Sequence, residues 1–302
     1  PPYQVMDGGG TGSSATPVYN AFVQIAIDTK PLYISQIMPA KWYSGGKGLD
    51  EFREQMLNDK HISKLVDFED SRDVFPTVDI AGGICYFLWD NSHNGMCKVV
   101  NKTSTSTISS TRYLNEFDAF IRDQRVLDII AKVQQSSTSF LSLGIRSFEK
   151  GFPASPGRNI SLFGSSGISY LSEKDIPQND HLIPKWKLIM SKASAEHAGQ
   201  TDKEGRKRIV SRLEVLQPGF ICTESYLLID TFDTENEAES AKKYIKTRFV
   251  RFLLGSILIT QNIVRDKFRF VPLQDFTDAS DIDWSQPVEG IDRQLYRKYG
   301  LT

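Results

Sequence analysis

The spacing of apolar residues in the first third of the chain changes between helical spacing and short continuous runs. Val18, Phe22 and Ile25 follow the spacing of one helix face, and Thr16-Pro17 before them is typical of a helix start. Short continuous apolar runs are typical of buried strands. The expected elements are a helix from 16–17, a strand at 32–38, a helix at 49–57, strands at 62–68 and 80–89, and a hairpin partner of the last strand at 96–100.

Strands and helices that alternate in this way predict an α/β fold and correspond to half of a doubly wound sheet. Residues 102–112 are rich in Ser and Thr and predict either a linker or a polar edge strand. We therefore expect a first domain at 1–112 and a second domain at 113–302.

The second domain mixes strands with amphipathic helices, which predicts an α+β fold. Apolar positions between Tyr113 and Gln135 have helical spacing, so a helix is expected there. Thr234 and Glu237 have the spacing of a capping box and predict the start of a long helix that ends near Leu258. Strands are expected at 160–163, 168–171, 186–191, 210–216, 220–230 and 268–273.

The bulk composition is that of a soluble globular protein and narrows the choice of function only slightly. The chain has 302 residues, with 40% hydrophobic and 24% charged residues and a formal net charge of -1. No apolar run reaches the roughly 18–20 residues of a membrane helix, so no membrane partner is expected. Three cysteines are too few for a disulfide framework, which favours a cytoplasmic location.

Several common site chemistries are disfavoured. The four histidines have no ligand spacing to cysteines or carboxylates, so no metal is expected. The glycine-rich stretches 7–14 and 45–48 lack the Gly-Lys-Ser/Thr ending of a P-loop and the GxGxxG spacing of a dinucleotide site. The acidic cluster of a nuclease is not found either, so any DNA cleavage by the whole enzyme is expected outside this chain.

Four motifs follow one another in the first part of the chain. They are Pro1-Pro2-Tyr3, the stretch 37–42 (Ile-Met-Pro-Ala-Lys-Trp), the glycine-rich stretch 45–53 and the segment 74–90, which begins Val-Phe-Pro. In this order they resemble the second half of the methylase domain in adenine-specific DNA methyltransferases of type II restriction–modification enzymes, the gamma class of amino-methyltransferases. The resemblance is close over about the first 100 residues and looser up to the closing segment 292–302.

The resemblance implies the second half of a Rossmann-like methyltransferase sheet, followed by a DNA target-recognition domain. It implies S-adenosylmethionine as the cofactor and methylation of adenine N6 on a flipped base in double-stranded DNA. Such enzymes bind the cofactor mostly with elements before the tetrapeptide that ends in Pro-Pro-Tyr. We therefore expect an N-terminal methyltransferase half outside this sequence, together with a nuclease domain if the whole enzyme cleaves DNA. The isolated chain is expected to be inactive.

The resemblance also assigns the reacting groups. The exocyclic amine of adenine is a poor nucleophile because its lone pair is delocalised into the ring. In these enzymes two oxygens accept the amine hydrogens: the backbone carbonyl of the first proline, here Pro1, and a polar side chain before it, which is outside the sequence. Pro2 fixes the carbonyl, and Tyr3 and Phe75 are expected to stack on the two faces of the base. Taken alone, Phe75 is more typical of a core residue at a strand entrance.

Basic residues of the second domain are concentrated between 185 and 212, around a glycine-containing loop. Lysine and arginine neutralise phosphates, and arginine also reads guanine edges. The candidate DNA contacts are Lys185, Lys187, Lys192, Arg206, Lys207, Arg208 and Arg212. A solvated basic loop explains the same composition, and the cations at 242–251 are more typical of a solvated helix face. The main alternative function is a module that recognises DNA without catalysis.

Overall fold

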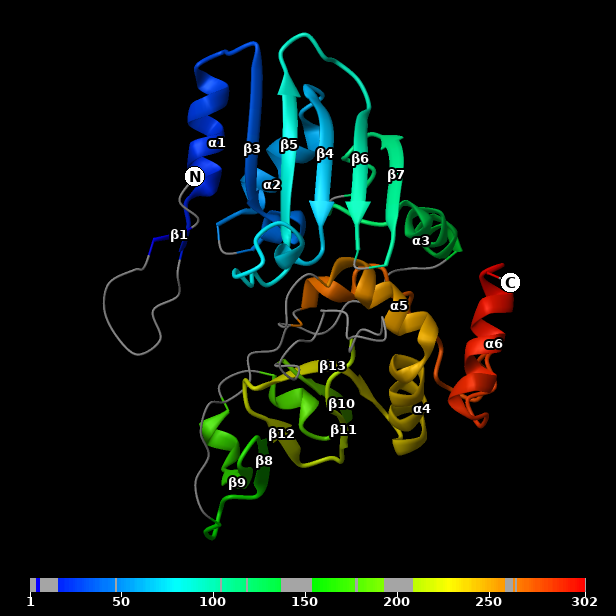
Figure 1. Cartoon of the computed structure of the whole chain (residues 1–302). Helices are drawn as coiled ribbons and strands as arrows, with labels where there is room; N and C mark the ends of the chain where they lie inside the picture. The colour runs from blue at the N-terminus through cyan, green and yellow to red at the C-terminus, as the bar shows by residue number, and fades with distance from the viewer. Residues whose placement is uncertain are drawn as a thin grey trace. The chain divides into compact units, whose positions relative to one another are not determined.

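The protein is described by a computed structural model in which the described residues fall into two compact units (Figure 1). The structure describes residues 4–5, 16–46, 48–103, 105–117, 119–136, 154–176, 179–192, 209–258, 263 and 265–301. The residues up to Asp128 make up the first unit, and most of the described residues after it make up the second.

The first unit contains a five-stranded mixed sheet with the strand order β3-β5-β4-β6-β7 (Figure 1). Its strands are β3 (Tyr33–Pro39), β4 (Ile62–Phe68), β5 (Ile84–Asp90), β6 (Cys97–Lys102) and β7 (Thr107–Arg112). β5 is antiparallel to both of its neighbours, β4 and β6 are parallel, and β7 is an antiparallel edge strand. The branched and aromatic side chains of β4 and β5 favour strands because they pack well on a pleated, half-buried surface.

The hairpin expected between residues 80–89 and 96–100 is wrong. β6 pairs with β4, with Lys64 opposite Lys98 and Val66 opposite Val100. β6 cannot pair with β5, because β3 and β4 already occupy both edges of β5. β7 confirms the polar edge strand, one of the two interpretations of the Ser/Thr-rich stretch.

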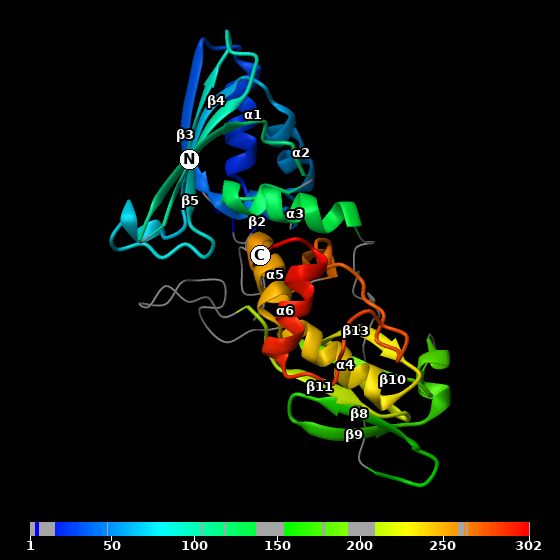
Figure 2. The same ribbon diagram turned by 90° about the vertical axis from the view of Figure 1, so that its right-hand side faces the viewer.

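Two α-helices and a 3-10 helix pack on one face of this sheet (Figure 2). They are α1 (Tyr19–Asp28), α2 (Asp50–Asn58) and η1 (Ala40–Ser44). Two acidic residues occupy the first turn of α2, where the helix dipole favours negative charge. The helix start expected at Thr16-Pro17 is wrong, because these residues are extended and pair with Gln4–Val5. α1 begins at Tyr19 instead.

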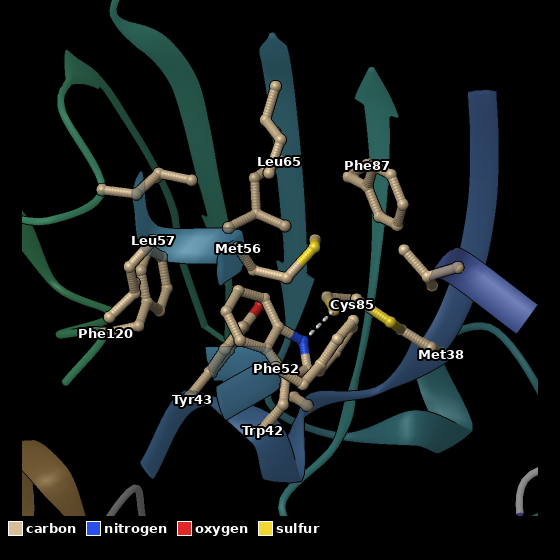
Figure 3. Close-up of a cluster of buried hydrophobic side chains, with 14 of the residues drawn as sticks. Met38, Trp42, Tyr43, Phe52, Met56, Leu57, Leu65, Cys85, Phe87 and Phe120 are labelled. Atoms are coloured by element: carbon tan, nitrogen blue, oxygen red, sulfur yellow. Dashed lines mark hydrogen bonds between the residues drawn. The ribbon is translucent and has the colours of Figure 1, made fainter. Parts of the chain in front are cut away.

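Aromatic rings dominate the core between these helices and the sheet (Figure 3). Trp42 and Phe52 meet edge to face with ring centroids 5.9 Å apart, and Trp42 Nε1 donates to Cys85 Sγ at 3.4 Å. Phe120 joins the cluster from a later segment, with its centroid 4.4 Å from that of Tyr43. Burying one such side chain contributes about 1.5–3 kcal/mol relative to exposing it. The core therefore holds the segment around Phe120 against the sheet.

The helix expected over residues 113–135 is wrong in its first part, because α3 spans only Gln124–Ser136. Phe120 is 2% exposed, and its backbone N–H donates to Tyr43 O at 3.0 Å. Before Gln124, the chain packs on the aromatic core and forms this long-range hydrogen bond in place of helical backbone hydrogen bonds.

The second unit contains two three-stranded sheets. The strands are β8 (Ile160–Gly164), β9 (Gly167–Leu171), β10 (Trp186–Ser191), β11 (Leu213–Leu216), β12 (Phe220–Cys222) and β13 (Tyr226–Phe232). One sheet has the order β11-β10-β13, and the other has the order β12-β8-β9. The single strand expected at 220–230 is wrong, because a turn in which Tyr226 N donates to Thr223 O at 3.1 Å divides it between the two sheets. The other strands expected between 160 and 216 are confirmed, with β11 shorter than expected.

Three α-helices follow the strands of the second unit: α4 (Glu235–Lys246), α5 (Arg248–Ile257) and α6 (Val288–Lys298). Thr234 Oγ1 accepts a hydrogen bond from Glu237 N at 3.2 Å, which confirms the predicted helix start. The single helix expected up to Leu258 is wrong, because Thr247 is extended, with ψ 154°. Asp292 of α6 accepts from the first two backbone N–H groups of α5 at 2.9 and 3.0 Å and so caps a new helix.

Residues 268–273, expected as a last strand, pair with no strand in the part of the chain that the structure describes. The buried Phe268 ends the 3-10 helix η5 (Arg265–Phe268), and Phe270 is buried in the irregular segment that follows. The predicted α/β class is confirmed by the helices packed on the mixed sheet of the first unit.

Candidate functional site

The described part of the candidate site is the connection between β4 and β5, which carries Phe75. We call residues 69–83 the Phe75 loop. Pro1, Pro2 and Tyr3 lie outside the described residues, so their assigned roles stay predictions. The loop leaves the sheet directly after Phe68, the last residue of β4.

Ser71 fastens the first part of the Phe75 loop. Its backbone carbonyl accepts from Phe75 N at 2.8 Å. Its Oγ donates to Val78 O at 2.7 Å and accepts from Ile80 N at 2.8 Å. Ser71 itself is 1% exposed, so its hydroxyl is shielded from solvent. One small side chain therefore sets the backbone path on both sides of Phe75.

The end of the Phe75 loop is fixed by a turn that requires glycine. Gly82 and Gly83 both have positive φ, at 89° and 77°. A Cβ on Gly83 would lie 2.1 Å from Phe68 O, and Gly83 O accepts from Ala40 N at 3.0 Å. The chain therefore returns to β5 in close contact with the residue where it left β4.

Phe75 lies half-buried against the sheet face opposite α1 and α2. Val66, Phe68 and Ile84 form the buried part of this small apolar cluster, and Ile80 packs on it from the loop. Half-burial is compatible with a ring that can stack on a base and with a core residue at a strand entrance. The stacking role of Phe75 therefore stays a prediction.

A buried ion pair lies on the helix-covered face of β4. Asp67 Oδ2 is 3.1 Å from Arg122 Nε and accepts from Asn101 Nδ2 at 2.6 Å. Asp67 is 0% exposed, and burial raises the pKa of its carboxyl above the usual value, although Arg122 and Asn101 favour the ionised form. Burial acts to lower the pKa of Arg122, but Asp67 and further nearby groups raise it above its usual value. Arg122 therefore stays charged in the interior.

The same arginine contacts the end of the Phe75 loop. Arg122 donates through its second terminal nitrogen to Gly82 O. Its guanidinium carbon lies 5.3 Å from the ring centroid of Tyr43, within the range of a cation–π contact. Arg112, which is 4% exposed, donates to the carbonyl of Ile121 and so fixes the backbone just before Arg122.

The candidate DNA contacts of the second unit lie at both ends of β10. Lys185 precedes the strand and forms an ion pair with Asp233. Lys192 follows the strand, and Arg212 lies beside it because Ser191 N donates to Arg212 O at 3.0 Å. A strand of this length spans roughly 20 Å, so the structure separates Lys185 from the other two. Arg206, Lys207 and Arg208 lie outside the described residues.

Lys187 differs from the other candidates because it is only 3% exposed. Its Nζ donates to Ile183 O at 3.1 Å and to Lys185 O at 2.7 Å, and burial lowers the pKa of Lys187 to about 8. Arg212, by contrast, is exposed and pairs with Glu214 at 2.6 Å. Because backbone carbonyls enclose the ammonium of Lys187, a phosphate could reach it only after a rearrangement. Its role in DNA binding stays a prediction.

The cations at 242–251 are divided by the break between α4 and α5. Lys242 pairs with Glu239 at 3.2 Å, and Lys243 Nζ donates to Trp284 O at 2.8 Å, so both are used within the unit. The remaining cations of this row, Lys246, Arg248 and Arg251, are exposed.

Metal and membrane sites are not found in the described ranges. Among these residues, no group of three or more His, Cys, Asp or Glu side chains is placed to hold a metal ion. No helix formed by them is both long and apolar enough to cross a membrane.

Sequence reasoning located Phe75 but missed the residues that hold its loop, namely Ser71, Asp67, Asn101 and Arg122. One signal was present, because Asp67 is a carboxylate between the apolar Val66 and Phe68 of the strand, and a buried carboxylate needs a partner. Arg122 gave no signal, since the spacing around it predicted a helix.

The first part of the chain matches a known family. A family model described as Eco57I restriction-modification methylase matches residues 1–75, which confirms the resemblance to restriction–modification methylases over this stretch. An uncharacterized adenine-specific methylase of Mycoplasma pneumoniae (strain ATCC 29342 / M129 / Subtype 1) is 36% identical over 152 residues. The match covers 46% of this chain and 36% of that relative, so the chain spans well under half of its length.

Solved structures of restriction–modification enzymes are similar only weakly. The type IIL enzyme MmeI in complex with DNA gives a TM-score of 0.39 at 7% identity, over 83% of this chain and 39% of MmeI. The type IIG endonuclease BpuSI gives 0.33 at 9% identity, over 94% and 44% of the two chains. A nuclease-deletion mutant of the type ISP enzyme LlaGI with a DNA substrate mimic gives 0.36 at 10% identity, over 88% and 35%. TM-scores this low support no conclusion about the fold or function of this chain.

Proposed function

We propose that the chain is part of an S-adenosylmethionine-dependent DNA adenine-N6 methyltransferase of a restriction–modification system. The observation that carries the proposal is the match of residues 1–75 to the methylase family, since this stretch begins with Pro-Pro-Tyr and ends at Phe75. The 36% identical relative named as an adenine-specific methylase supports the choice of base. The activity is proposed for the whole protein, of which this chain is one part.

In the proposed reaction, the chain holds the adenine and prepares its amine. The carbonyl of Pro1 accepts one amine hydrogen, which helps to localise the lone pair on the nitrogen. Tyr3 and Phe75 stack on the two faces of the flipped base, which fixes the amine in the direction of attack. The positioned amine would then accept a methyl group from bound S-adenosylmethionine.

S-adenosylmethionine supplies the methyl group, and the residues described do not themselves fit this cofactor. Aromatic and aliphatic side chains fill most of the space between the sheet and its helices. We therefore propose that the cofactor is held mostly by the part of the enzyme outside this chain. No residue of this chain is assigned to it.

For the second unit we propose recognition of the DNA target. Lys192 and Arg212 flank residues 193–208, which include the basic residues 206–208. Side chains at this end of β10 would contact the phosphates and base edges of double-stranded DNA. Lys185 would make a separate phosphate contact, because it lies at the opposite end of the strand.

The test uses the intact protein, labelled S-adenosylmethionine and mixed-sequence duplex DNA. The wild type is expected to place label on adenine, and Tyr3→Ala and Phe75→Ala are each expected to lower the rate about 5- to 150-fold, as the loss of one base–aromatic stack of about 1–3 kcal/mol predicts. Val78→Ala is the matched control, because Val78 lies in the same loop and is 41% exposed. Its rate should match that of the wild type.

Two results would contradict the proposal. Label on cytosine would exclude adenine as the target. No label on any base, with DNA binding retained, would favour a module that recognises DNA without methylating it.

A further inference from the structure

The buried ion pair of Arg122 connects the interior of the first unit with the Phe75 loop. One end of the guanidinium pairs with Asp67, which is held in turn by Asn101 directly opposite on β6. The other end donates to Gly82 O, where the loop turns back toward β5. Residues from two strands, a loop and the segment before α3 therefore meet at one side chain.

Stability alone is a poor reason for this arrangement. A buried ion pair loses the hydration of both charges, and a well-packed apolar pair of similar volume is often at least as stable. Asp67 Oδ1 and Arg122 Nε are also both buried without a hydrogen bond of ordinary geometry. An apolar pair, however, could not bind the Gly82 carbonyl. The feature that only the arginine provides is a fixed position for that carbonyl.

The geometry of Arg122 suits this task because the arginine is itself fixed. The backbone before it is held by Arg112 at Ile121 and by the hydrogen bond from Phe120 to Tyr43. Two nitrogens of the planar guanidinium reach Asp67 and Gly82 at the same time: one donates to Gly82 O, and Nε pairs with Asp67 by charge without forming a hydrogen bond. A lysine ammonium in its place would have to approach both oxygens from one point.

We propose that Arg122 is a positioning residue for methyl transfer. It holds the end of the Phe75 loop, as Ser71 holds its beginning, and so keeps Phe75 in the place from which it stacks on the flipped adenine. This inference rests on the proposed function, because the stacking role of Phe75 belongs to it. Arg122 itself lies in the interior and touches no substrate.

The test is a double-mutant cycle on the intact protein with labelled S-adenosylmethionine and target duplex. Arg122→Lys keeps the charge but removes the planar bridge, and kcat is expected to fall about tenfold or more, as for other small misplacements of a reacting group. The affinity for DNA should change little. In a Phe75→Ala background, the same change should have almost no further effect, because its action passes through Phe75.

The emission of 2-aminopurine at the target adenine supplies a readout of the base itself. Arg122→Lys should shift this emission from the wild-type level toward that of Phe75→Ala. Arg125→Lys is the matched control, because Arg125 pairs with Asp123 at 2.6 Å on the surface and has no contact with the loop. Should Arg122→Lys fail to fold, Asp67→Asn replaces it, since this nearly isosteric change releases the guanidinium without leaving a cavity.

The outcomes separate the inference from the proposed function. A wild type that places no label on adenine overturns the proposed function and the inference together. An active wild type overturns the inference alone if the folded Arg122 variant keeps the wild-type kcat and emission. The inference is also overturned if the effect of the Arg122 variant on kcat adds fully to that of Phe75→Ala. A slow variant whose effect disappears in the Phe75→Ala background supports it.

Discussion

The change Ser71→Ala tests whether the Phe75 loop is fastened as the structure indicates. It removes the hydroxyl that donates to Val78 O and accepts from Ile80 N. Val78 is exposed, so water can replace the lost donor there, whereas Ile80 is half-buried and its N–H loses its acceptor. A neutral hydrogen bond contributes about 1 kcal/mol, and a buried unsatisfied group costs about 1–3 kcal/mol, so we expect the closed loop to lose about 2 kcal/mol.

Hydrogen exchange of backbone amides measures this loss directly. Since 1.36 kcal/mol corresponds to a factor of ten, 2 kcal/mol predicts roughly 30-fold faster exchange at Phe75 and Ile80, provided that these amides exchange by local opening. Global stability should fall by less, because the five-stranded sheet and its aromatic core keep their contacts. Under the proposed function, methyl transfer should slow along with the faster exchange.

The matched control is Ser92→Ala. Ser92 Oγ also makes a short hydrogen bond, to Asp90 at 2.7 Å, but in an exposed turn after β5. This variant should leave exchange at Phe75 unchanged. The reasoning is refuted if Ser71→Ala leaves the exchange at Phe75 and Ile80 within about twofold of the wild type, which corresponds to less than about 0.5 kcal/mol.

Three further changes test other parts of the fold. Gly83→Ala should destabilise the first unit by about 3 kcal/mol in urea unfolding, because φ is positive and the new Cβ would meet a carbonyl oxygen at 2.1 Å, whereas Gly95→Ala should be mild. Asp292→Ala should cost about 2 kcal/mol by the same measurement, because it removes both acceptors at the start of α5, and Asp292→Asn should cost less. The pKa of Lys187 is about 8 in the fold and 10.5 for a free side chain. Between pH 8 and 10.5 the unfolded state therefore binds more protons at this residue than the folded state does. The free energy of unfolding of the wild type, measured relative to Lys187→Met, should rise from pH 8 to 10.5 and stay constant below pH 8.

Local pattern predicted most elements of the first unit, but not how they pair. The strand expected at 62–68 is found at those residues, and α2 differs from its expected range by one residue at each end. The pairing of β6 was missed because a turn after β5 suggested a hairpin, whereas strand partners depend on which edges remain free once the sheet has formed. The same limit applies around Phe120, where apolar spacing suggested a helix but residues 119–121 are buried without helical structure, with Phe120 N bonded to Tyr43 O.

In the candidate site too, the sequence indicated some residues and only the fold showed the others. Phe75 was found from a short motif, because the residues that identify it are neighbours in the sequence. Arg122 and Gly82 are 40 residues apart, and no spacing rule connects a residue to a carbonyl at that distance. For Lys187, composition predicts a DNA contact, and only the fold shows that two backbone carbonyls accept hydrogen bonds from its ammonium.

Under the proposed stacking role, the half-buried position of Phe75 gives a physical reason for anchors at both ends of its loop. A ring that packs on Val66 and Phe68 must leave part of this apolar contact to stack on a base, and that exchange costs free energy unless the base replaces the lost area. If the whole loop moved, binding would also have to restore the order of its backbone, at about 1–2 kcal/mol for each residue fixed. With Ser71 and Gly82 held, the change can be confined to the side chain of Phe75. The anchors therefore reduce the entropic cost of stacking, and loosening either one should lower the rate of methyl transfer more than the affinity for DNA.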